Sequence, residues 1–414
     1  MKILFESKFS ELQIDNFISS IHENILKKPN DKYFFDLSQT EWISNQGLLL
    51  ITGILKYFFE KGIEFEVSFF PKGTPTTTIP KRVAIQIIAI WDIWGLWKIF
   101  PIDVCENYLG INYNTIQSLK KIHDISNLLR PQIYDNFKIT PFICLDKITQ
   151  YDDKIITDKL IQYHALNEAT IEIVDSHNCE HPFINGIFGK IISKELYENF
   201  LDHFDNSFFN VENEYAFMSL ALKGRIDEDK ERNKGVDVQR VLEQNFETEE
   251  LEKSIGFFYD EINQVFKNQS YITYSFLDFG VGISTTLRKA YHEHYKANGN
   301  DSDILKFAFS HDSSRHPIKN PFYANKLEEF IPRGLFDIIS IVKRYRGLLI
   351  VRSCSGKVIY DFSSTNNTDE AFKSFDELNT YFPGTFLSIY LPAIPKGETI
   401  DNSVFKPDFK IPDY

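Results

Sequence analysis

The sequence predicts an α/β protein, in the form of an α+β sandwich, and two observations lead to this prediction. The first hundred residues give a strand, a helix and a second strand in order, and the chain from residue 190 onward again alternates helical and β-rich segments. The chain has 414 residues, which at about 150 residues per domain is enough for two or three domains.

The N-terminal domain is expected over residues 1–105. A strand at Lys32–Leu37 precedes an apolar helix over about Gly47–Glu60, and Gly62 follows at the position where glycine commonly ends a helix. The alternation of apolar and polar residues over Phe65–Phe69 predicts a second strand. Together these elements make a small α/β unit.

A mixed connector is expected over residues 106–180, and the most apolar run of the chain, Val83–Phe100, precedes it. Gln86, Asp92 and Lys98 interrupt this run. A membrane-spanning helix needs about 20 consecutive residues that are almost free of charge. The run therefore predicts a buried or interface helix, and no membrane span is expected.

The composition argues against several classes of protein. The net charge is −13 and the pI is near 5.3, so the basic surface that is typical of nucleic-acid binders is not expected. The four Cys are widely separated and form no CxxC pair, which argues against a disulfide framework or a structural zinc site. Early charges in the N-terminal segment argue against a signal peptide, and we expect a cytoplasmic protein.

The C-terminal domain is expected over residues 181–395, followed by a polar tail over 396–414. Its predicted helices are Lys190–Phe204 and the amphipathic Leu335–Tyr345. Its predicted strands are Tyr215–Leu222, Tyr271–Leu277, Leu348–Ser353, Lys357–Phe362 and Thr385–Leu391.

Long segments separate these elements. An insert over 223–270 begins with a charge run, and its part 236–266 is rich in Glu with a helical period. The segment 284–333 is polar and poor in glycine, and we expect it to be irregular. A loop of Ser, Thr, Asn and Asp is expected over 363–370.

The first pattern with chemical potential is Glu195-xxx-Asn199-xxx-His203. On a helix these positions share one face, so a carboxylate, an amide and an imidazole project together. A polar outer stripe would look the same. In a functional interpretation, Asn199 gives an oxygen to a magnesium ion, and Glu195, one turn earlier, orients or deprotonates a water.

The second pattern is Asp278-x-Gly280-x-Gly282-Ile283, directly after a predicted strand. It is compatible with an ordinary turn, because glycine readily adopts positive φ. In a functional interpretation Asp278 accepts a hydrogen bond from the amino group of adenine, and the two glycines let the backbone approach the ring.

The third pattern is Arg333-Gly334-Leu335 at the start of a helix, with Gly384-Thr385 at the start of the last strand. A helix N-terminus presents unpaired amides and a partial positive charge, which suit a phosphate group. The hydroxyl of Thr385 could reach adenine directly or through water. By itself, each of these is also an ordinary element boundary.

In this order and on these elements, the patterns resemble the GHKL ATPase family, which includes gyrase B, the ninety-kilodalton heat-shock chaperones, histidine kinases and MutL. The resemblance covers residues 185–392 and implies that ATP and Mg²⁺ bind between a helical layer and a mixed sheet of a Bergerat-type fold. The matching motifs are the Glu195/Asn199 helix, DFGVGI (278–283), IPRGLFDII (331–339) and FPGTFLSIYLP (382–392).

The resemblance also implies that 284–333 is a mobile lid over the phosphates, and here the sequence departs from the family. Gly334 is the only glycine from 300 to 346, whereas the family's lid usually carries several. Ser313, Ser314 and Arg315 could contact phosphate instead, or could belong to a solvated loop.

The N-terminal domain resembles a STAS domain, the fold of anti-sigma-factor antagonists, over FFDLSQTEWISNQGLLLITGILKYF (34–58). In phospho-regulated members a serine stands just before the glycine that opens the helix. The matching position before Gly47 is Gln46, and Ser44 is two positions away from it. The resemblance therefore implies a binding or dimerising module without a phosphorylation switch.

These observations lead to one functional hypothesis and two alternatives. The hypothesis is a Mg²⁺-dependent, ATP-hydrolysing regulatory switch of bacterial type, in which ATP controls a protein partner or self-association through the STAS-like domain and the 236–266 insert. The alternatives are a protein serine kinase of the anti-sigma-factor type and a nucleotide-gated scaffold that does not hydrolyse ATP. A phage-defence system is a setting that would suit this pairing of domains.

Overall fold

The structure is a computed structural model in two compact units, each described separately below. The first unit comprises 1–153, 209–277 and 379–381, and the second comprises 154–208, 278–378 and 382–414. One parallel and one antiparallel sheet confirm the mixed α/β class. The described residues are 2–5, 8–9, 11–21, 32–40, 42–68, 137–139, 143–146, 179–180, 192, 195–196, 199–200, 215–223, 271–310, 313, 334–375, 381–392 and 394–395.

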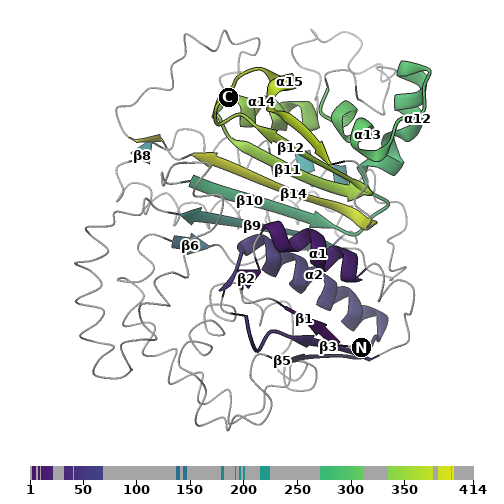
Figure 1. Cartoon of the computed structure of the whole chain (residues 1–414), viewed down its shortest axis with the longest axis vertical. Helices are drawn as coiled ribbons and strands as arrows, with labels where there is room; N and C mark the ends of the chain where they lie inside the picture. Colours follow the sequence, from purple (N-terminus) through teal and green to yellow (C-terminus); the bar gives the residue numbers. More distant parts are fainter. Residues whose placement is uncertain are drawn as a thin grey trace. The chain divides into compact units, whose positions relative to one another are not determined.

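A three-stranded parallel sheet lies in the first unit (Figure 1). Parallel neighbours need crossover connections, and the helices α1 and α2 lie in the two connections between these strands. The sheet order is β1 (Lys2–Leu4), β3 (Tyr33–Asp36) and β5 (Phe65–Ser68); α1 is Glu11–Ile21, α2 is Asn45–Lys61, and two short strands, β2 (Lys8–Phe9) and β4 (Trp42–Ile43), pair separately.

Helix α2 begins two residues before its predicted start and ends one residue after its predicted end. The hydroxyl of Ser44 caps its N-terminus by accepting a hydrogen bond from the amide of Gly47 at 3.0 Å. Gly62 closes the C-terminus in the left-handed conformation, with φ of 66°. Because Ser44 is only 4% exposed and its hydroxyl is engaged in the cap, a kinase has no access to it in this fold.

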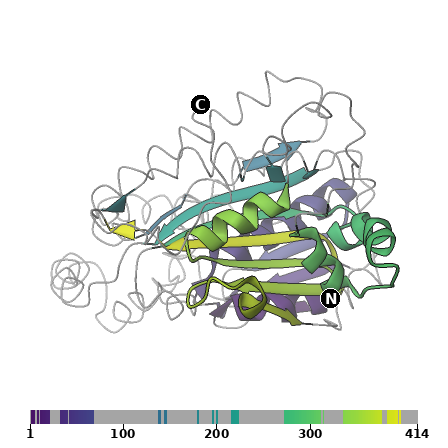
Figure 2. The same cartoon turned by 90° about the horizontal axis from the view of Figure 1, so that it is seen from above.

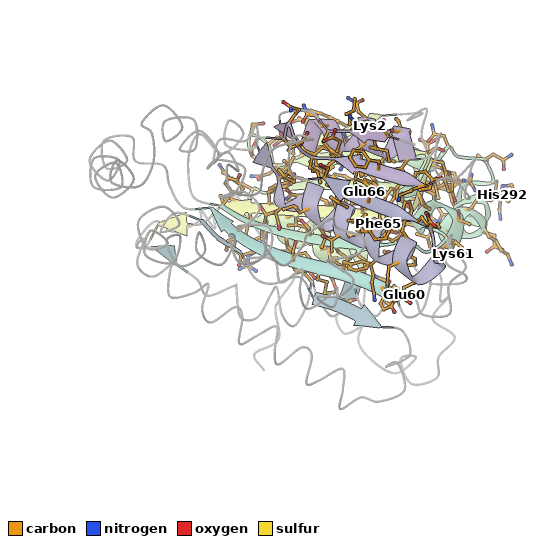
Figure 3. All side chains as sticks on the ribbon, turned by 90° about the horizontal axis from the view of Figure 1, so that it is seen from below. Lys2, Glu60, Lys61, Phe65, Glu66 and His292 are labelled. Carbon is orange, nitrogen blue, oxygen red and sulfur yellow. The ribbon has the colours of Figure 1, made fainter. Side chains whose placement is uncertain are left out.

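One side of α2 packs on the parallel sheet, where the ring of Phe58 contacts those of Tyr33, Phe35 and Phe65. The strands β3 and β5 alternate buried and half-buried residues, as a sheet with one covered face requires. The other face carries charges, among them Lys2 and Glu66 (Figure 3).

The other side of α2 packs on β9 (Tyr215–Lys223) of the same unit. The hydroxyl of Tyr57 accepts from the amide of Tyr215 at 3.0 Å and donates to its carbonyl at 3.3 Å. Asn45 Nδ2 donates to Ser219 Oγ at 2.9 Å. An apolar helix buried on nearly all sides follows from this double packing.

Strand β9 lies between two partners in this unit. It neighbours β10 (Tyr271–Asp278), whose last residue belongs to the second unit. On its other side it pairs antiparallel with β6 (Phe137–Ile139) and β7 (Ile143–Asp146). The strands predicted at Tyr215–Leu222 and Tyr271–Leu277 are thus confirmed within one residue.

The second unit is built on an antiparallel sheet of order β13-β12-β11-β14. All residues of β11 and all but the last residue of β14 are buried, so both faces of these strands are covered. The bounds are β11 Leu348–Cys354, β12 Gly356–Asp361, β13 Phe372–Phe375 and β14 Phe382–Pro392; a separate pair is formed by β8 (Cys179–Glu180) and β15 (Ile394–Pro395).

The expectation that 284–333 is irregular is wrong for its first part. This part forms α12 (Ile283–Tyr295) and α13 (Asp301–Ala308), which pack side by side (Figure 1). The N-terminus of α13 has a capping box in which Asn300 and Asp303 exchange hydrogen bonds, a local signal that the polar composition concealed.

Asp301 anchors these two helices to the β11–β12 hairpin. Its carboxylate accepts from the amide of Ser355 at 2.9 Å and pairs with Arg288 of α12. Its carbonyl accepts from the hydroxyl of Ser284 at 3.2 Å. The start of the expected lid is therefore fixed to the sheet rather than free to move over it.

Helix α14 (Leu335–Arg344) confirms the predicted amphipathic helix and packs on β11 and β14 (Figure 2). A short turn joins it to β11, and the amide of Gly347 in this turn donates to the carbonyl of Val342 at 2.8 Å. The turn joins the C-terminus of α14 to the start of β11, and Ser353 lies near the opposite end of that strand.

Some of the remaining elements differ from those that the sequence predicts. The predicted loop at 363–370 contains the start of α15 (Thr368–Ala371), which leads into β13. Strand β1, helix α1 and the short strands β2, β4, β6, β7 and β8 were not predicted. The aromatic run at 83–100 and the insert helix at 236–266 lie outside the described residues. Among the residues that are described, no helix is long and apolar enough to cross a membrane.

The anchoring role of Asp301 can be tested by substitution. Asp301→Ala should lower the free energy of unfolding by about 1–3 kcal/mol, because the Ser355 amide loses its acceptor. Asp369→Ala is the matched control: its carboxylate pairs with Lys306 at 3.1 Å but is 83% exposed, so its loss should cost at most about 1 kcal/mol. Equal costs in chemical denaturation would contradict the anchoring role.

Candidate functional site

Asp278 ends β10 and is buried, with 8% of its surface exposed. Burial raises the pKa of its carboxyl from an ordinary 3.8 to about 7. Hydrogen bonds from Gly280 and Thr385 oppose this shift by stabilising the charged form. A buried carboxyl that titrates near neutrality, at the end of a strand, is a candidate for ligand recognition.

The carboxylate of Asp278 has acceptor capacity left after these contacts. The amide of Gly280 donates to Oδ1 at 2.9 Å, and Thr385 donates through both its hydroxyl and its amide. A carboxylate offers about four acceptor positions, so roughly one remains for a donor from a ligand. An exocyclic amine is a group of suitable kind.

The glycines around Asp278 are required by close packing. A Cβ atom on Gly384, whose φ is +108°, would lie 2.1 Å from the carbonyl oxygen of Asp278 and 2.6 Å from the Cα of Phe279. A Cβ on Gly282, whose φ is +80°, would lie 2.8 Å from the carbonyl oxygen of Gly384. Any other residue at either position would push the two segments apart.

A residue that the sequence patterns did not include joins these glycines. The hydroxyl of Ser353 accepts from the amide of Ile283 at 2.8 Å and donates to the carbonyl of Gly384 at 2.8 Å. Its neighbour Cys354, at a β-bulge with φ of +54°, lies under the same turn and contacts the carbonyl of Val281 at 3.5 Å. In the sequence, the feature that could have indicated this role is the pair of polar residues, Ser353 and Cys354, at the end of an apolar strand.

A second cluster gathers Glu195, Asn199 and Gly334, which are far apart in sequence. A Cβ atom on Gly334 would lie 3.9 Å from Asn199 Nδ2 and 4.0 Å from Glu195 Oε2. Both side chains are half-buried, on helical residues. The Nδ2 atom of Asn199 is buried and has no hydrogen-bond partner among the described residues. The first and third sequence patterns thus meet at the start of α14.

The N-cap position of α14 supplies no side-chain hydrogen bond to the start of the helix. Gly334, with φ of +54° and ψ of −120°, precedes Leu335 and has no side chain with which to cap the first amides of the helix. The partial positive charge of a helix N-terminus favours an anionic group at this point. The unpaired amide of Asn199 lies beside it.

Both clusters belong to the second unit. The carboxylate cluster surrounds the ends of β11 and β14, where Ser353 pairs with Thr385. The second cluster lies at the start of α14, the helix that packs on the same two strands.

Not every predicted site residue can be located. Gly280 and Thr385 contact Asp278, whereas Gly282 and Ile283 lie against Ser353. Leu335 is the first residue of α14. Arg333 and His203 lie outside the described residues. Within the described ranges, no three His, Cys, Asp or Glu side chains gather into a group that could hold a metal ion by themselves.

Comparison of the chain with family models, with curated proteins and with solved structures finds no match. The resemblance stated above therefore rests on the residues themselves, and the site is interpreted from its own chemistry.

The buried carboxyl of Asp278 should make stability depend on pH. Its folded pKa lies above its unfolded value, so the proton is held more tightly in the native state, and stability falls as pH rises from about 4 to about 7. A shift from 3.8 to about 7, at 1.36 kcal/mol per unit, corresponds to roughly 4 kcal/mol.

Asp278→Asn removes this ionisation and should flatten the decline. Urea denaturation of both proteins between pH 4 and pH 8 measures it, and the difference between them should grow with pH. Parallel pH profiles for the two proteins would show that Asp278 titrates normally.

Proposed function

We propose that the second unit binds ATP with Mg²⁺ and hydrolyses it, as a switch that controls association of the protein with a partner or with itself. The observation that carries the proposal is that five distant segments of one unit assemble two chemically different clusters. One cluster offers a buried carboxylate for a base, and the other offers an amide, a carboxylate and a helix N-terminus for phosphates.

At the base end, Asp278 accepts a hydrogen bond from the amino group of adenine. The acceptor position left free by Gly280 and Thr385 supports this role. Guanine carries a carbonyl at the corresponding place, and two acceptors facing each other would be unfavourable. The close approach of Gly282 to Gly384 leaves the turn with a bare backbone, which a flat ring can approach.

At the phosphate end, the residues fit a magnesium ion that is shared with the nucleotide. Mg²⁺ takes oxygen ligands and keeps several waters and substrate oxygens, so it does not need a cluster of protein carboxylates. The oxygen and nitrogen of an Asn amide exchange positions when the amide group is turned by 180°. The position of the unpaired Nδ2 atom of Asn199 can therefore be taken by its Oδ1 atom, which is a ligand for Mg²⁺. When bound, the ion offsets charge on the phosphate oxygens.

Glu195 is the residue proposed to act on water. It lies one helical turn before Asn199, and both face Gly334. From there its carboxylate aims a water at the terminal phosphate and accepts a proton from it. The amides at the start of α14 hold the phosphates in place while this occurs.

A second candidate, a nucleotide-gated scaffold with little hydrolysis, is favoured by one observation. The beginning of the expected lid is folded into α12 and α13, which Asp301 holds against the β11–β12 hairpin. A lid that is partly immobile closes less readily over phosphates, which slows turnover. Comparing bound nucleotide with released phosphate separates the two candidates. Transfer of labelled phosphate to another protein would instead indicate the serine-kinase alternative.

Glu195→Ala should abolish ATP turnover and leave ATP affinity within about threefold of the wild type, because the residue acts on water rather than on the nucleotide. Phosphate release and calorimetric binding measure the two quantities. Glu293→Ala, which changes an exposed glutamate of α12, is the control and should preserve both. Normal turnover in Glu195→Ala would rule out the assigned role.

Asp278→Asn should weaken ATP binding by about tenfold or more, because one hydrogen bond from adenine to a charged acceptor is lost. In the wild type, affinity should also fall as pH drops below about 7, since the carboxyl then holds its own proton. Calorimetry at pH 6 and pH 8 with both proteins provides the measurement. Unchanged affinity in the variant would place adenine elsewhere.

A further inference from the structure

Ser353 is the last residue but one of β11, and its hydroxyl connects three segments that are distant in sequence. It accepts a hydrogen bond from the amide of Ile283, the first residue of α12, and it donates one to the carbonyl of Gly384 at the start of β14. Both bonds measure 2.8 Å, and the residue has no exposed surface. A hydroxyl can satisfy both neighbours because it has one proton to give and lone pairs to accept with.

The hydroxyl of Ser353 is closely packed by its neighbours. A Cβ atom on Gly282 would lie 2.5 Å from Ser353 Oγ, so the turn presses directly on it. Ser353 and Gly384 are buried, so removal of the hydroxyl would leave the Gly384 carbonyl without this donor in a place shielded from solvent, and the Ile283 amide would lose its acceptor. Buried backbone groups are rarely unpaired.

The two partners of Ser353 belong to the two segments that flank the candidate base site. Ile283 follows the glycine turn that begins at Asp278, and Gly384 precedes Thr385, which donates to Asp278. The separation of the turn from Thr385 therefore depends on the bridge that Ser353 makes. We propose that Ser353 is a positioning residue, whose hydroxyl sets the geometry of the Asp278–Thr385 pair for recognition of the nucleotide base.

This inference rests on the proposed function for its ligand, and it differs from a general structural role in what it predicts. A positioning residue at the base end changes recognition of the base and leaves the phosphate end alone. A residue that merely holds the unit together would weaken both ends alike. Mg²⁺·ATP and Mg²⁺·tripolyphosphate are two probes that share phosphates and differ in the base, so their affinities separate the two roles.

A matched control lies on the adjacent strand. Ser388 of β14 is also fully buried, and its Oγ has no hydrogen-bond partner among the described residues. Ser388→Ala therefore removes the same atom from the same sheet without removing a bridge. Ser353→Ala should reduce affinity for Mg²⁺·ATP about tenfold, equivalent to 1.4 kcal/mol, and change affinity for Mg²⁺·tripolyphosphate less than twofold. Ser388→Ala should change neither.

Hydrogen exchange in the protein without nucleotide tests the bridge independently of ATP. The amide of Ile283 should exchange about tenfold faster in Ser353→Ala than in the wild type and in Ser388→Ala. Faster exchange together with a selective loss of ATP affinity supports the inference. Equal loss for both probes, or unchanged exchange, overturns it. If the wild type binds no nucleotide, the proposed function fails and the base-positioning role fails with it, whereas the exchange result still decides whether the bridge exists.

Discussion

The close approach of two backbone segments at Gly384 is the constraint on which the second unit depends. A Cβ atom on Gly384 would lie 2.1 Å from the carbonyl oxygen of Asp278, so the start of β14 lies directly against the end of β10. Thr385 follows, and its hydroxyl and amide both reach the carboxylate. The glycine is thus a requirement of packing, and the polar contacts of the site follow from it.

This packing buries an ionisable carboxyl group, which lowers stability and at the same time tunes the pKa of the site. Enclosing Asp278 removes water from a group that would otherwise be ionised, and the three donors around it only partly replace that water. The ionisation of Asp278 near neutral pH therefore lowers the stability of the folded state. Such a local conflict between stability and chemistry is typical of functional sites in proteins.

Helix α2 is apolar on nearly all sides because it packs on the parallel sheet with one side and on β9 with the other. Phe58 faces the parallel sheet, while Tyr57 and Asn45 bind the backbone and side chains of β9. The charged face of the sheet in the first unit carries Lys2 and Glu66 (Figure 3).

The sequence by itself determined the elements whose signals are local. Gly62 marks the end of α2, alternation marks β5, and the run before Asp278 marks β10, because caps and periodicity act over a few residues. The start of α2, capped by Ser44, lies two residues before the predicted one. It also pointed to Glu195, Asn199, Gly334 and Asp278 as candidates. It missed α12 and α13, whose polar surfaces obscure the helical period while their caps and contacts with Asp301 stabilise them.

Only the tertiary structure decided which candidates meet. The approach of Gly334 to Asn199, the contact of Gly384 with Asp278, and the bridge made by Ser353 join residues separated by tens to more than a hundred positions. No local rule encodes these distances, because they result from how strands pair and helices pack. A single hydroxyl at the end of an apolar strand acquires its role from that packing alone.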